Sequence, residues 1–85
     1  MIYAYLIQDA WGHWIGVEPV NRKAHDKRRR EAERQGKFVK TSLMLPWTDK
    51  NYLHWYYKVP EKHRKDFDMG FRVRVKVDPA IFCVD

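Results

Sequence analysis

A single basic segment, from residue 21 to residue 37, sets the limits on how this chain can fold and what it can contact. The segment reads NRKAHDKRRREAERQGK and contains eight of the 17 Lys and Arg residues but three of the 11 acids, which leaves nine bases and eight acids elsewhere. Eight bases minus three acids is +5, so the net charge of +6 is almost entirely local. This concentration of positive charge is typical of contact with a polyanion, because each neutralised phosphate releases condensed counterions.

The same segment predicts a helix without a core face. Asn21 is suited to cap the N-terminus of such a helix, and Gly36 is suited to end it. Between them the apolar residues are Ala24 and Ala32, so the apolar stripe that anchors a surface helix is missing. We therefore expect a basic helix or arm over residues 21–37 that is solvated and orders fully only on its partner.

The length and the aromatic content bound the rest of the fold. A chain of 85 residues predicts one domain, residues 1–85, that buries about 60 to 65% of the surface its unfolded chain exposes. Large side chains must supply much of that burial, and the sequence has four Trp, five Tyr and four Phe. We expect Trp11, Trp14, Trp55 and Tyr57 to lie in the core.

No targeting or membrane segment is predicted. The longest apolar runs are far shorter than the roughly 18 residues of a membrane span, and the N-terminus lacks the positive region of a signal peptide. The single Cys83 forbids an internal disulfide, which fits a reducing compartment. The expected location is the cytoplasm, with no membrane contact.

Alternation of apolar and polar residues predicts the strands. Residues 1–8 and 14–20 are rich in β-branched and aromatic residues, and residues 9–12 form a turn between them. Alternating patterns over 38–45 and 52–59 predict a hairpin whose loop carries Trp47. Residues 60–67 predict a short helix. In the cleanest strand, 71–77, Phe71 and three valines face the core.

These elements predict an α+β fold: a small antiparallel sheet of four or five strands with one polar basic helix and one short helix. The split β-α-β, ferredoxin-like arrangement is one way to close it, and this leaves one sheet face open. The layout resembles that of RNA-recognition-motif domains, although the fragment Gly36-Lys37-Phe38-Val39 of that family's basic-Gly-aromatic signature falls on a different element.

The open face is predicted to combine aromatic rings with cations, as platforms for unpaired bases do. Beside the strand 52–59 it would carry Tyr3 and Tyr5, or the residues next to them. Together with the basic segment, this face predicts a non-catalytic nucleic-acid-binding protein that prefers single-stranded RNA or DNA to duplex. The candidate contact residues are Arg22, Lys23, Lys27, Arg28, Arg29, Arg30, Arg34, Lys37, Tyr52, Tyr56, Arg72, Arg74 and Lys76.

Catalysis has little support in the sequence. The four histidines are His13, His25, His54 and His63, and no two stand at the i,i+4 spacing of a helical metal site. The sequence has no phosphate-binding glycine loop, no nucleophile elbow and no Cys-His signature. We expect no enzyme activity, no cofactor and no metal.

Two other classes of function stay open. A small interaction protein, such as a phage or mobile-element factor, could dock on a host enzyme and modulate it, with Trp11, Trp14 or Trp47 as anchors. A structural subunit could use the apolar residues 80–84, AIFCV, to pack on its own core or to form a homodimer.

Overall fold

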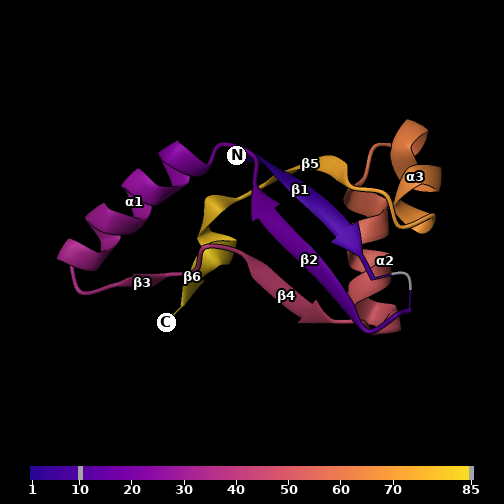
Figure 1. The fold of residues 1–85 in the computed structure, drawn as a ribbon, viewed down its shortest axis with the longest axis horizontal. Helices are drawn as coiled ribbons and strands as arrows, with labels where there is room; N and C mark the ends of the chain where they lie inside the picture. Colours follow the sequence, from indigo (N-terminus) through magenta and orange to yellow (C-terminus); the bar gives the residue numbers. More distant parts are fainter. Residues whose placement is uncertain (10, 85) are drawn as a thin grey trace.

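The computed structural model describes residues 1–9 and 11–84, and its elements are shown in Figure 1. The strands are β1 (Ile2–Gln8), β2 (Trp14–Pro19), β3 (Phe38–Val39), β4 (Leu43–Pro46), β5 (Val73–Val77) and β6 (Cys83–Val84). The helices are α1 (Arg22–Arg34), α2 (Asp49–Lys58) and α3 (Arg64–Asp68), with single 3-10 turns η1 (Glu61–His63) and η2 (Pro79–Phe82).

The main sheet is antiparallel throughout and has the order β4-β2-β1-β5. A second, two-stranded sheet pairs β3 with β6. The predicted α+β class and the four-stranded antiparallel sheet are confirmed. The ferredoxin-like arrangement is not confirmed, because β1 and β2 form a hairpin with no helix between them. Of the predicted turn at 9–12, residue 10 lies outside the described residues.

One face of the sheet carries the core. Alternate residues of three strands are buried there: Ala4, Leu6, Ile15, Val17, Val73, Val75 and Val77. Trp55 and Val59 of α2, Phe67 of α3 and Phe82 of η2 complete this cluster. Within the tail residues 80–84, Phe82 is buried in the chain's own core and Ile81 packs against it, whereas Ala80, Cys83 and Val84 are exposed.

The predicted strand over 52–59 is wrong, because these residues belong to helix α2. The Oγ1 atom of Thr48 accepts a hydrogen bond from the N–H of Asn51 at 3.1 Å and so caps the helix. Trp55 is buried, whereas Leu53 and Tyr57, which the strand pattern placed on the same face, are 47% and 66% exposed. The segment alternates with a period of two but also repeats aromatic residues at the spacing of a helix, and the capped helix is the outcome.

Three other predicted elements need smaller corrections. The strand 38–45 divides into β3 and β4, which belong to different sheets, so the predicted hairpin with 52–59 does not exist. The short helix 60–67 becomes η1 followed by α3. The last strand begins at Val73, and Phe71 is exposed instead of buried.

The helices lie at opposite ends of an elongated molecule of 40 × 22 × 17 Å. In Figure 1, α2 and α3 stand at one end of the sheet and α1 stands beyond the other end. No helix in the described part of the chain is long and apolar enough to cross a membrane. The sheet face opposite the core is formed by residues that alternate with the core positions, and these residues are half-buried or exposed.

Candidate nucleic-acid interface

Helix α1 begins and ends where the sequence predicts. The side chain of Asn21 accepts a hydrogen bond from the N–H of Ala24 at 3.1 Å, which satisfies one of the free donors of the first turn. Gly36 has a φ of 77°, in the left-handed region that favours glycine after a helix. The N–H of Lys37 then donates to the carbonyl of Ala32 at 2.9 Å.

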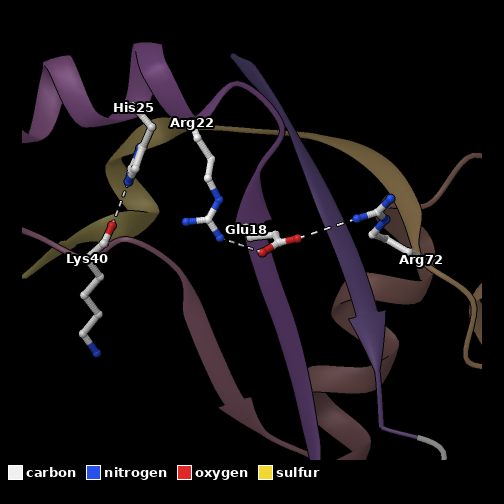
Figure 2. A network of polar contacts seen from close by, with 5 residues as sticks. All are labelled: Glu18, Arg22, His25, Lys40 and Arg72. Carbon is white, nitrogen blue, oxygen red and sulfur yellow. Dashed lines mark hydrogen bonds and ion pairs between the residues drawn. The ribbon is translucent and has the colours of Figure 1, made fainter.

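The helix is anchored by a residue that the hydrophobic pattern did not reveal. His25 is 3% exposed, and its ring meets the ring of Phe82 edge-on with a centroid separation of 4.8 Å. Its Nε2 atom lies 2.8 Å from the carbonyl oxygen of Lys40, as Figure 2 shows. The predicted solvated arm is therefore a helix packed through His25, and Ala32 packs against the core beside it.

The charges of α1 separate into a paired side and an outward side. The half-buried Arg29 lies 3.7 Å from Asp26 and 3.2 Å from Glu33. It therefore forms ion pairs with two of the three acidic residues of the helix. The outward side, which we call the basic stripe, is exposed and consists of Lys23, Lys27, Arg30 and Arg34. Within the described residues no ion pair involves the basic stripe. Its spacing of four, three and four residues places all four cations on one helix face, over roughly 16 Å.

The open sheet face joins tyrosines of β1 to cations at and beside β5. Tyr3 lies opposite Lys76 in the strand register, and Tyr5 lies opposite Arg74. The guanidinium carbon of Arg72 lies 4.1 Å from the centroid of the Tyr5 ring. Arg74 and Lys76 both lie 5.5 Å from the ring of Tyr3. The predicted outward row of cations therefore exists, and each of its members is within cation–π distance of a tyrosine.

A shallow hollow of about 330 Å³ lies on the same face, beside the tyrosines. Gly16 of β2 lies at its floor, and the indole of Trp14 lies across Gly16. Ile7 and Met44 add apolar walls. The hollow is polar on one side, where it is lined by Glu18, Ser42 and Arg72.

One carboxylate connects the open face to α1. The Nη2 atom of Arg22 donates to Oε2 of Glu18 at 3.1 Å, and the other oxygen of Glu18 lies 4.0 Å from Nη1 of Arg72. Figure 2 shows Glu18 between these two arginines, which come from the first residue of α1 and from the residue before β5. Glu18 therefore connects the first residue of α1 to the cation row of the sheet face.

Tyr52 and Tyr56 do not join this surface, because they lie on α2 instead of the sheet. The ring of Tyr52 stacks on Phe67 at 5.9 Å and also contacts Trp47. Burial, followed by the hydrogen bond that its hydroxyl donates to Asp68, raises the pKa of Tyr52 to about 12. The ring of Tyr56 lies 5.2 Å from the guanidinium of Arg64. Both tyrosines support the packing of α2 on α3.

The sequence prediction missed the residues of the hollow, although a signal for them was present. Ile15 and Val17 are core residues, so strict alternation places Trp14, Gly16 and Glu18 on the opposite face. The prediction that Trp11, Trp14 and Tyr57 are core residues is wrong. Trp14 is half-buried on the face opposite the core, Trp11 is 82% exposed, and Tyr57 is exposed as well. Trp55 is 5% exposed, and the prediction for it is confirmed.

A second surface feature is an apolar groove of about 710 Å³ between β4 and α2. Leu43, Leu45, Leu53 and Tyr57 supply much of its lining. Strand β4 is at one edge of the sheet, so its outer side has no neighbouring strand in the described fold. Lys50 and His54 line the same groove, and no carboxylate does so among the described residues.

The described residues include no cluster of three His, Cys, Asp or Glu side chains that could hold a metal ion. Comparison with protein-family models, with curated proteins and with solved structures finds no significant match to the chain.

Proposed function

We propose that this protein binds single-stranded nucleic acid without catalysis, through the open sheet face and the basic stripe of α1. The observation that carries the proposal is the pairing of every cation of the β5 row with an aromatic ring on an uncovered sheet face. Cations neutralise phosphates, and accessible aromatic or guanidinium planes stack on unpaired bases. Both kinds of group are present on one surface, which the Glu18 bridge extends to α1.

The geometry favours a single strand over a duplex. Bases inside a duplex are stacked on each other, so Tyr3, Tyr5 and Trp14 can contribute only if the bases are unpaired. The basic stripe is different, because it contacts phosphates and can follow either form. A protein that used the stripe alone would show little preference between the two.

The test is a salt titration of binding to a fluorescent oligothymidylate and to a duplex of equal length. If seven cations contact phosphates, four from the stripe and three from the β5 row, log K should fall against log salt with a slope of about −5, since each contact to a single strand contributes roughly −0.7. Changing Lys23, Lys27, Arg30 and Arg34 to Gln should reduce the slope by about 3 units by the same rule. Changing Arg72 and Arg74 to Ala should weaken binding to the single strand more than binding to the duplex.

A charge-matched control is available on the opposite part of the molecule. Lys50, Lys58, Lys62 and Lys65 are exposed and lie on or next to α2 and α3. Changing these four to Gln removes the same charge as the stripe variant and should leave the slope nearly unchanged. Equal losses in the two quadruple variants would refute a defined site and indicate nonspecific attraction to a basic protein.

The second candidate function is docking on another protein, and the groove beside β4 is the observation that favours it. The occupant that fits is an extended partner segment with apolar and acidic residues, which would add a strand to β4 and complement Lys50 and His54. Such a complex would depend only weakly on salt. A protein that binds no oligonucleotide, yet binds an alternating Leu/Glu peptide and loses it on Leu53→Asp, would support this second function against the first.

A further inference from the structure

The hollow on the open face is built so that a flat ring can rest against Trp14. A Cβ atom at Gly16 would lie 3.2 Å from Cζ3 of the Trp14 indole and 3.4 Å from Cγ2 of Ile7. A larger residue at this position would therefore push the indole away from the sheet. Gly16 lets the indole lie close to the backbone, and the remaining space of about 330 Å³ is open to a ligand.

The polar edge of the hollow presents an acceptor that is held in place. Glu18 contacts Arg22 through one carboxylate oxygen and Arg72 through the other. A carboxylate has about four lone-pair sites, so these two contacts leave it able to accept hydrogen bonds from a ligand. The two arginines restrict the rotation of the carboxylate.

A fixed carboxylate beside a stacking ring selects among the bases by their donors. Guanine presents two neighbouring N–H donors, N1–H and the N2 amino group, which match the two oxygens of one carboxylate. Adenine and cytosine present one amino group next to a ring nitrogen acceptor, which a carboxylate repels. Uracil and thymine present one N–H between two carbonyl oxygens. Glu18 can therefore form two good hydrogen bonds only with guanine.

We propose that the hollow formed by Trp14, Gly16 and Glu18 binds one unpaired guanine of a single strand, with the ring stacked on Trp14 and its two donors on Glu18. The inference rests on the proposed function, because the strand is held by the cations of the same surface. Arg72 lies at the edge of the hollow and is placed to contact the phosphate next to the bound base.

The experiment compares short oligothymidylates that carry a single central dG, dA, dC or dT, with fluorescence anisotropy as the measure of affinity. The strand with dG should bind roughly tenfold more tightly than the others, as expected for one bidentate contact to a base. Glu18→Gln should abolish this preference, because an amide offers one acceptor and adds a donor that opposes guanine. Trp14→Leu should lower the affinity for all four strands.

Two controls separate base recognition from general charge and from unfolding. Glu31→Gln removes the same charge from an exposed position on α1 and should retain the dG preference. Near-ultraviolet circular dichroism and thermal melts should show that Glu18→Gln folds like the original protein, since Glu18 is on the surface side of β2.

The inference and the proposed function fail in different ways. If all four strands bind equally, or if Glu18→Gln retains the dG preference, the guanine site is refuted while binding of single strands stands. If guanosine monophosphate binds as tightly as the dG strand, the hollow is a free-nucleotide site, and the strand-bound form of the inference is refuted. If no strand binds at all, the proposed function itself is wrong and the inference falls with it.

Discussion

Replacing His25 with Ala tests whether α1 is a fixed part of the molecule or a free arm. The side chain fills a buried position, contacts Phe82 edge-on and is hydrogen-bonded to the Lys40 carbonyl. Removing the imidazole leaves the carbonyl oxygen of Lys40 without its hydrogen-bond donor, which costs about 1–3 kcal/mol. Lys40 is exposed, so water can replace the donor and the cost lies towards the lower end of this range. The lost aromatic contact adds about 0.5–1.5 kcal/mol, and the better helix propensity of Ala returns about 0.5 kcal/mol.

The expected net loss is therefore about 2 kcal/mol in the free energy of unfolding. This loss is a large part of the whole free energy of unfolding, because roughly 4–13 kcal/mol is typical for a chain of 85 residues. Urea denaturation should show a lower midpoint at an unchanged m-value, and a thermal melt should shift down by about 10 °C or somewhat more. Amide hydrogen exchange should accelerate most in α1, which loses its anchor.

His54 provides the matched control, because it is an exposed histidine on helix α2. His54→Ala should change stability by no more than about 0.5 kcal/mol. If the two variants have the same stability, His25 does not hold the helix, and the solvated arm predicted from the sequence is the correct description. A second measurement is the affinity for the fluorescent oligothymidylate. The basic stripe should contribute less to this affinity in His25→Ala, although no residue of the stripe has changed.

Two further predictions test other parts of the structure. Trp55→Ala should destabilise the protein by about 3–5 kcal/mol, whereas Leu53→Ala should be nearly neutral in the same urea assay. Comparable losses would favour the predicted strand over 52–59, which places both side chains on one face. The raised pKa of Tyr52 predicts that stability falls as the pH rises from 10.0 to about 12, because the unfolded tyrosine ionises first while the folded one keeps its proton. Tyr52→Phe should flatten this part of the pH profile in denaturation measurements and Tyr57→Phe should not, so equal profiles would refute the role of the Asp68 hydrogen bond.

Where the sequence predicted the type of an element correctly, one local pattern, either strict alternation or a pair of capping residues, pointed to that type. The strand Val73–Val77 alternates strictly, and α1 is bounded by Asn21 and Gly36 with their own capping geometry. The segment that became α2 has two competing signals, because its aromatic residues fit both a period of two and a helical spacing. Thr48 caps this helix and Asp49 is the acidic residue of its first turn. These two residues identify the helix more directly than the hydrophobic pattern does.

The sequence predicted which basic residues lie on the candidate surface, but it predicted only some of the aromatic residues beside them. Strand alternation alone places Arg72, Arg74 and Lys76 on one side. Which aromatic residues lie beside them depends on strand order, and the order β4-β2-β1-β5 puts Tyr3 and Tyr5 there instead of Tyr52 and Tyr56. The anchoring of α1 by His25 was not predictable from polarity, because a buried histidine needs a hydrogen-bond partner that only the tertiary fold supplies.

The contacts between cations and rings are the reason why we propose the sheet face, and not the tyrosine cluster of α2, as the nucleic-acid site. Arg72 already lies over Tyr5 in the free protein, so part of the entropy lost on ordering this long side chain is lost before the ligand binds. Its planar guanidinium can stack on a base while its N–H groups reach a phosphate. Tyr52, in contrast, has Phe67 and Trp47 against its ring and Asp68 on its hydroxyl, so a base would have to replace contacts that hold α2 and α3 together. In the proposed function, a strand on the sheet face would therefore leave the core undisturbed, whereas a strand on the α2 cluster would not.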